Sequence, residues 1–213
     1  MTSWLNRARI KKAVILSSAL LSILGGLWLY GNFHTVREGL IFRSAQLPPV
    51  SLWFYTRLFH IRSVINLQGA DPKSYWYRAE LRTAGQLGIQ HIDYRLSALR
   101  EVSVQEADDL LRTIDRAPKP VLLHCAGGAD RSGLVSALWL YARQRLPAKE
   151  AAKQLSIYYG HIPALSAGTA AMDKSYWEYV AATEATPVSS TPQLDDSVRT
   201  LPPSQSALAI RQP

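Results

Sequence analysis

Residues 121–133 read VLLHCAGGADRSG, and this stretch decides the fold of the chain. The apolar run Val121–Leu123 predicts a short buried strand that ends at His124. A loop with two glycines follows, and apolar residues such as Leu134 and Leu138 then recur at helical spacing. We therefore expect a strand, a glycine-containing loop and the first turn of a helix in direct succession.

This loop has the features of an anion site. A loop that leads into a helix N-terminus points several free backbone N–H groups at one spot, and the helix dipole adds positive potential there. Gly127 and Gly128 let the backbone approach a ligand closely. The same potential favours the thiolate of Cys125, and Arg131 offers a planar fork for two phosphate oxygens. The loop therefore predicts attack on a phosphate, with a cysteinyl-phosphate that is hydrolysed in a second step.

The pattern His-Cys-x5-Arg-Ser-Gly at residues 124–133 resembles the signature loop of the cysteine-dependent protein tyrosine and dual-specificity phosphatases. In layout the resemblance extends from about residue 39 to residue 180. It implies that Cys125 is the nucleophile and that Arg131 binds the phosphate and stabilises the transition state. It also implies that His124 helps to hold the cysteine loop and that Ser132 assists breakdown of the intermediate.

The same resemblance implies that backbone amides of the loop line the phosphate site. These amides belong to Ala126, Gly127, Gly128, Ala129, Asp130 and Arg131. Asp130, directly before the arginine, resembles variants in bacterial and in lipid- or phosphoinositide-directed members of the family. Together with the N-terminal segment described below, the resemblance implies a bacterial, membrane-anchored member. The alternatives are a buried structural cysteine, a rhodanese-like sulfur carrier, whose loops usually differ in length, and a low-molecular-weight phosphatase or arsenate reductase, whose loop lies near the chain start.

Length and charge limit the other classes. The chain has 213 residues, enough for one domain with appendages, and a formal net charge of +8. Positive charge can attract nucleic acid, anionic lipid or a phosphorylated substrate. Within the domain no Lys/Arg run has interleaved aromatic residues, so we expect no nucleic-acid partner. A single cysteine excludes an intrachain disulfide.

The N-terminal residues predict a membrane anchor. Residues 1–12 are basic, and residues 13–31 follow without a charge, a length that just spans a bilayer as a helix. The basic flank predicts a cytoplasmic N-terminus, with the catalytic domain outside the cytoplasm, which is the periplasm in a bacterium. A cleaved signal peptide is the alternative, although no small-x-small site follows cleanly. A buried core helix is a second alternative, although the segment lacks a polar face.

Residues 32–184 form the predicted phosphatase domain. Apolar strand patterns at residues 39–44, 63–67, 89–96 and 121–124 alternate with helical patterns. This alternation predicts an α/β fold with a central, mainly parallel sheet flanked by helices, like that of dual-specificity phosphatases, behind an N-terminal transmembrane helix. The cysteine loop at the carboxyl end of a strand agrees with where such sheets bind ligands.

The general acid has three candidates. The leaving oxygen needs a proton, and the family places an Asp on a loop between the preceding strand and helix. Glu101 lies in that loop but is a glutamate, whereas Asp93 lies at a plausible distance upstream but within a strand pattern. Asp130 is the third candidate, and we prefer Glu101 slightly over the other two.

The remaining residues predict no further site. Residues 185–213 are rich in Pro, Ser, Thr and Gln, a composition that predicts a disordered tail. The scattered histidines have no metal-ligand spacing, so we expect neither a metal nor another cofactor.

The function that the sequence predicts is hydrolysis of phosphate monoesters on phosphotyrosine or phosphoserine proteins or on a membrane phospholipid. The alternative is a catalytically weak phosphate-binding pseudophosphatase. The oligomeric state is left open.

Overall fold

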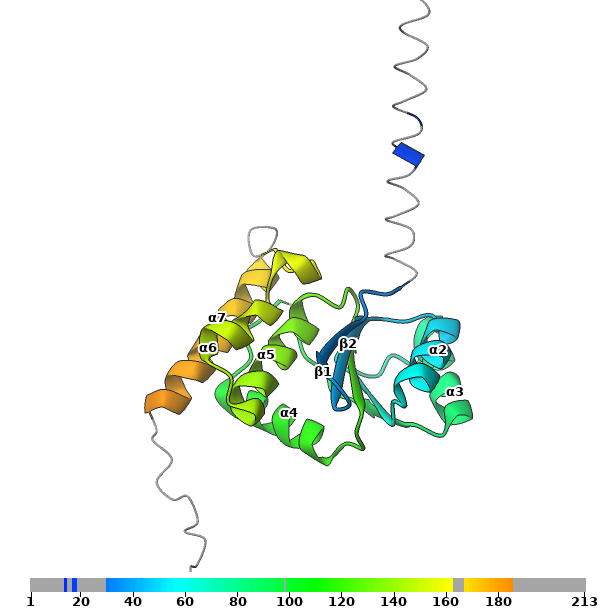
Figure 1. Ribbon diagram of the computed structural model, residues 1–213, viewed down its shortest axis with the longest axis horizontal. Helices are drawn as coiled ribbons and strands as arrows, with labels where there is room; N and C mark the ends of the chain where they lie inside the picture. Colours follow the sequence, from blue (N-terminus) through cyan, green and yellow to red (C-terminus); the bar gives the residue numbers. More distant parts are fainter. Residues whose placement is uncertain (1–13, 15–16, 19–29, 98, 163–166, 186–213) are drawn as a thin grey trace, which may run out of the picture.

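The computed structural model describes residues 14, 17–18, 30–97, 99–162 and 167–185 (Figure 1). The predicted disordered tail lies outside these residues, apart from Ala185. The described chain builds one mixed sheet of five strands in the order β1-β2-β5-β3-β4. The parallel strands are β2 (Ile41–Ala45), β5 (Val121–Cys125), β3 (Ser63–Asn66) and β4 (Gln90–Asp93). The predicted α/β class with a mainly parallel sheet is confirmed.

One edge strand was not predicted. Strand β1 (His34–Arg37) pairs with β2 in antiparallel orientation. It has only four residues, and its side chains alternate between half-buried and exposed. Such a short edge strand carries little apolar periodicity, so the sequence alone gives a weak signal for it.

Helices cover both faces of the sheet (Figure 1). On one face lie α2 (Pro49–Phe59) and α3 (Tyr75–Leu87); on the other lie α4 (Val104–Arg116), α5 (Asp130–Gln144) and α7 (Ala167–Ala185). The pleat of β5 divides the core accordingly, because Leu122 packs with Phe42 and Leu52 while Leu123 packs with residues of the α4–α5–α7 side.

Helix α5 is the central helix of the fold. Its residues from Ser132 to Leu140 are all buried, so it is enclosed nearly all round rather than amphipathic. Its N-terminus begins at Asp130, directly after the glycine loop that follows β5. The predicted succession of strand, loop and helix is therefore present at the centre of the molecule.

The segment after α5 is irregular. Pro147 precedes α6 (Ala148–Ala151), which ends after four residues and gives way to two 3-10 turns, Ala152–Gln154 and Ile157–Tyr159. The carbonyl oxygen of Gln154 accepts a hydrogen bond from Nη1 of Arg43 at 2.7 Å. The buried side chain of Arg43 thus donates to the carbonyl oxygen of Gln154, which would accept a backbone N–H if the helix continued.

The predicted localisation needs correction. The sequence predicted a single-pass membrane protein with its catalytic domain outside the cytoplasm, but no helix in the described part of the chain is long and apolar enough to cross a bilayer. Helix α7 has 19 residues, yet charged residues such as Asp173 and Lys174 interrupt it. Most of the predicted anchor, residues 13–31, lies outside the described residues.

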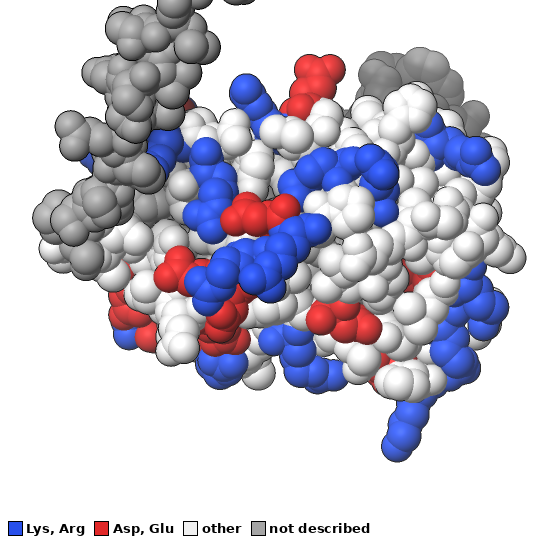
Figure 2. All heavy atoms as spheres, turned by 90° about the horizontal axis from the view of Figure 1, so that it is seen from below, with Lys and Arg blue, Asp and Glu red and all other residues white. Residues whose placement is uncertain are grey.

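Charges of both signs share the surface. Figure 2 shows one face on which Asp and Glu side chains lie among the Lys and Arg side chains. Ion pairs such as Arg143–Asp115 at 2.8 Å and Lys153–Glu150 at 2.6 Å are largely exposed. Exposed pairs of this kind contribute about 0–1 kcal/mol each, so they do not decide the fold.

Candidate active site

The last two residues of β5, His124 and Cys125, point to opposite faces of the sheet. Sγ of Cys125 lies 3.5 Å from Oγ of Ser132 on α5, and both residues are buried. The preceding residue, His124, points to the other face, where its Nε2 lies 3.1 Å from Oε1 of Glu80 on α3. Strand alternation therefore directs the cysteine toward the helix that starts beside it.

The N-terminus of α5 faces the cysteine loop. The N–H of Gly133 is bonded to the carbonyl of Ala129 at 3.0 Å, which begins the helical hydrogen-bond ladder. The amides that precede Gly133 have no intrahelical acceptor and carry the positive end of the dipole of a 15-residue helix. Chemically, this end of the helix suits an anion beside Cys125.

Arg131 lies across the carboxyl ends of two neighbouring strands. Its Nη1 is 3.4 Å from the carbonyl oxygen of Leu67, after β3, and 3.5 Å from that of Leu96, after β4. It lines a cavity of about 420 Å³ together with Arg95 and Arg100. The side chain of Arg131 thus borders a cavity whose wall carries two further cations, Arg95 and Arg100.

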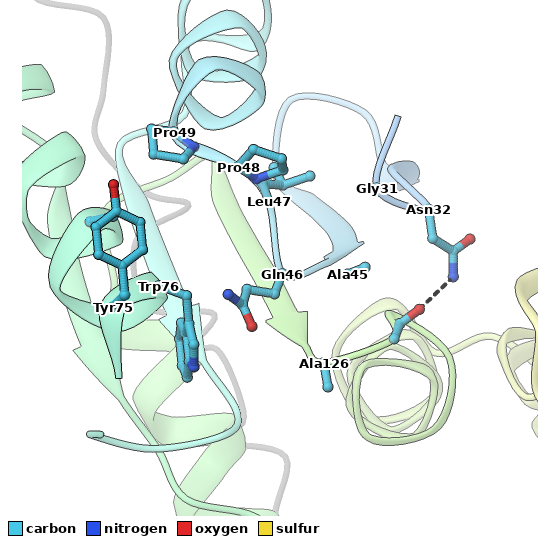
Figure 3. Close-up of a pocket in the computed structure, with 12 residues that line it drawn as sticks. Gly31, Asn32, Ala45, Gln46, Leu47, Pro48, Pro49, Tyr75, Trp76 and Ala126 are labelled. Atoms are coloured by element: carbon cyan, nitrogen blue, oxygen red, sulfur yellow. Dashed lines mark hydrogen bonds between the residues drawn. The ribbon is translucent and has the colours of Figure 1, made fainter. Parts of the chain in front are cut away.

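A second cavity borders the other end of the loop (Figure 3). It has a volume of about 450 Å³, and Ala126 and Gly127 form part of its wall. The rest is mainly apolar and includes Tyr75 and Trp76 from α3 and Pro48 and Pro49 at the start of α2, with the ring of Tyr75 near Pro49. An apolar or aromatic group attached to a bound phosphate could lie here.

The tyrosine phosphatase family matches residues 24–145 of the chain, which is more than half of its length. The chain belongs to this family. The match includes both Cys125 and Arg131, and the phosphatase is of the cysteine-dependent kind.

Solved phosphatases share the fold. TpbA of P. aeruginosa in complex with pTyr is 19% identical with a TM-score of 0.51, over 70% of this chain and 90% of that chain. Tk-PTP is 21% identical with a TM-score of 0.55, over 72% and 97% of the two chains. The core catalytic domain of the PP-IP phosphatase SIW14 of S. cerevisiae is 17% identical with a TM-score of 0.52, over 72% and 93%.

The three candidate acids lie in different surroundings. Asp93 ends β4 on the α3 face, where its carboxylate accepts bonds from the hydroxyl of Tyr77 at 2.5 Å and from Nδ2 of Asn66 at 2.8 Å. The bond to Asp93 raises the pKa of Tyr77 to about 12, so the hydroxyl stays a donor. Cys125 points to the opposite face, so the structure does not bring Asp93 and the cysteine together.

Glu101 lies in the loop before α4, as predicted. Its Oε1 is 2.8 Å from Nζ of Lys174 on α7, and both side chains are exposed. It borders a different cavity from the one that Arg131 lines.

Asp130 opens α5 and lies one residue before Arg131. Its Oδ1 is 2.8 Å from Nδ1 of His161, whose Nε2 is 2.9 Å from Oδ2 of Asp173. In the described part of the chain no group of three or more His, Cys, Asp or Glu side chains is placed to hold a metal ion.

Three buried residues of this region were not predicted from the sequence to belong to the site. Arg43, in the middle of β2, is fully buried, and its guanidinium contacts the cysteine loop. Glu80 is buried on α3, and His161 is buried beside Asp130. The only signal for Arg43 is a cation within an otherwise apolar strand, and the contacts of Glu80 and His161 are long-range.

The buried carboxylate of Glu80 is held ionised by two histidines. Burial would raise the pKa of Glu80, but the charge of His124 and the hydrogen bonds from His124 and His91 outweigh it and lower the pKa to about 2. A lowered carboxylate pKa stabilises the folded state above the unfolded value of about 4.3, and that stabilisation is lost as pH falls toward 2.

We expect Glu80→Gln to lower the free energy of unfolding at pH 7 by about 3 kcal/mol and to flatten its decline between about pH 4.5 and pH 2. Urea unfolding at pH 7, 5 and 3 measures both effects. Glu178→Gln, at an exposed glutamate of α7, is the matched control and should behave as the wild type. An unchanged decline in Glu80→Gln would show that Glu80 does not carry this pH dependence.

Proposed function

We propose that the phosphatase hydrolyses phosphate monoesters through a cysteinyl-phosphate, with phosphotyrosine side chains as its main substrates. The observation that carries this proposal is the position of Cys125: it ends β5 at the N-terminus of α5, 3.5 Å from the hydroxyl of Ser132, with Arg131 on the same turn. Nucleophile, cation and unpaired helix amides thus share one site.

In the proposed reaction the thiolate of Cys125 attacks phosphorus and the bond to the leaving oxygen breaks. Arg131 and the loop amides bind the three equatorial oxygens, and a carboxylic acid gives the leaving oxygen its proton. Water then attacks the phospho-cysteine, its proton returns to that carboxylate, and inorganic phosphate leaves with the thiolate restored. Ser132 is placed to donate a hydrogen bond to the sulfur as it leaves.

The cavity of Figure 3 supports an aromatic leaving group, because Trp76 and Tyr75 line the same cavity as Ala126 and Gly127 of the loop. The pTyr complex of TpbA is consistent with this choice. A second candidate, a substrate with further phosphate groups, is favoured by the cavity of Arg95, Arg100 and Arg131, and SIW14 is described as a PP-IP phosphatase. Phosphoserine proteins and phospholipids are the other classes to compare.

The test is phosphate release by the full-length chain from a phosphotyrosine peptide, a phosphoserine peptide, an inositol polyphosphate and a phosphatidylglycerol phosphate. We expect the phosphotyrosine peptide to have the highest kcat/KM. A higher value for the inositol polyphosphate would favour the second candidate. Phosphate binding without release from any of them would instead indicate a phosphate-binding pseudophosphatase.

For the general acid we propose Asp130, because it lies in the catalytic loop, whereas Glu101 borders another cavity and Asp93 lies on the far face of the sheet. We expect Asp130→Asn to lower kcat about 100-fold for phenyl phosphate, whose phenolate is a poor leaving group that needs a proton. We expect a much smaller loss for p-nitrophenyl phosphate, whose leaving group is less basic. Glu101→Gln and Asp93→Asn are the comparison variants. If Glu101→Gln alone shows this leaving-group dependence, the acid is Glu101.

A further inference from the structure

We propose that Arg43 positions the phosphate cradle from behind, with Asn32 as its partner at the loop entrance. This inference rests on the proposed phosphate-binding role of residues 126–131. Arg43 does not touch the substrate in this proposal; it fixes the peptide groups that do.

Four successive carbonyl groups of the loop accept hydrogen bonds from outside it. The carbonyl of Ala126 accepts from the N–H of Gln46 at 3.3 Å. The carbonyl of Gly127 accepts from Nδ2 of Asn32 at 3.1 Å (Figure 3). Nη2 of Arg43 donates to the next two, the carbonyls of Gly128 at 2.9 Å and of Ala129 at 2.8 Å. Every carbonyl between the cysteine and α5 is thus held on the outer side of the loop.

Carbonyl direction fixes amide direction. In a planar trans peptide the N–H points opposite to the C=O of the same peptide group. Because Arg43 holds the carbonyls of Gly128 and Ala129 outward, the N–H groups of Ala129 and Asp130 point to the inner side, where an anion beside Cys125 would lie. Because Asn32 holds the carbonyl of Gly127 outward, the N–H of Gly128 in the same peptide group also points to the inner side.

Arg43 is itself firmly held. Its Nη1 donates to the carbonyl and to Oε1 of Gln154 at 2.7 and 2.8 Å, and its guanidinium lies 4.3 Å from the centre of the Tyr159 ring. At Gly133, an added Cβ would lie 3.1 Å from Nη2 of Arg43, so this glycine leaves the room that the guanidinium needs.

The buried guanidinium stays charged at neutral pH. Burial lowers the pKa of Arg43 to about 10, and the negative charge of Cys125 works in the opposite direction. A positive charge therefore stands behind the loop, while Arg131 supplies another on the substrate side. The lysine side chain has the same charge but no fork, so Arg43→Lys separates the geometry of the bonds from the charge.

The experiment measures equilibrium binding of inorganic phosphate to the full-length chain by calorimetry, together with competitive inhibition by phosphate. We expect Arg43→Lys to weaken phosphate binding about tenfold or more and to raise KM for p-nitrophenyl phosphate with it. Arg37→Lys, at an exposed arginine of the neighbouring strand β1, is the matched control and should bind phosphate as the wild type does. Wild-type phosphate affinity in folded Arg43→Lys would overturn the proposal.

Asn32→Gly keeps the test decisive if Arg43→Lys does not fold. Asn32 has a φ of +48°, which glycine adopts freely, and its side chain is only half-buried. We expect at least a threefold loss of phosphate affinity, and an unchanged affinity would overturn the proposal. Failure of the wild type to turn over any phosphoester, with phosphate still bound, would contradict the proposed function. Weakened phosphate binding by Arg43→Lys would then still support the role of Arg43.

Discussion

Cys125→Ser is expected to release phosphate at least about four orders of magnitude more slowly than the wild type. A serine hydroxyl stays protonated at neutral pH and is a poor nucleophile without an adjacent base, and the neighbouring Ser132 is not a base. Initial rates with p-nitrophenyl phosphate measure this loss.

The same variant should still bind phosphate within a few-fold of the wild type, because the proposed phosphate site consists of backbone amides and Arg131 and does not depend on the thiol. Calorimetric titration with inorganic phosphate measures the affinity, and thermal unfolding confirms that the variant is folded. A rate within tenfold of the wild type would remove Cys125 from the mechanism. A loss of both binding and folding would mean that the thiol is structural.

Gly128→Ala is expected to lower the free energy of unfolding by about 3 kcal/mol or more. Gly128 has a φ of +68°, and an added Cβ would lie 2.3 Å from the backbone nitrogen of Ala45 and 2.6 Å from the carbonyl carbon of Ser44. Both atoms belong to β2, so the loop and this strand would have to separate. Because these groups are backbone, no side chain can move aside to make room.

Gly127→Ala is the matched control for this prediction. A Cβ at Gly127 meets no atom within 4 Å, and its φ is not positive. We expect its free energy of unfolding to stay within about 0.5 kcal/mol of the wild type. Urea unfolding of the two variants measures the difference, and equal stabilities would show that β2 and the loop are not as closely packed as the structure has them.

The central motif was predictable because it is local. Residues 121–133 contain the apolar strand, the two glycines and the helical repeat in one uninterrupted stretch, and all three appear as expected. Ser103 and Glu106 have the spacing of a capping box at the start of α4, and Oγ of Ser103 accepts from the N–H of Glu106 at 3.2 Å. The side chain of Glu106 instead pairs with Arg100, which lies outside that local pattern.

The surroundings of the loop were not predictable from local patterns. Arg43 and Gln154 are 111 residues apart, and Asn32 and Gly127 are 95 apart, yet each pair is hydrogen-bonded. The choice among the candidate acids also depended on such contacts. The sequence preferred Glu101, and the structure pairs Glu101 with Lys174, 73 residues away, which moves our proposal to Asp130.

By itself, the sequence determined the order of strand, cysteine loop and helix, and with it the position of a cysteine beside a helix N-terminus. It did not determine which way the peptide groups of the loop face. Only the tertiary structure decided that, because the bonds that hold these carbonyls come from strand β2 and its neighbourhood, where Arg43 lies buried beneath the loop. Local preferences leave a glycine loop free to adopt many conformations, and long-range hydrogen bonds select one of them.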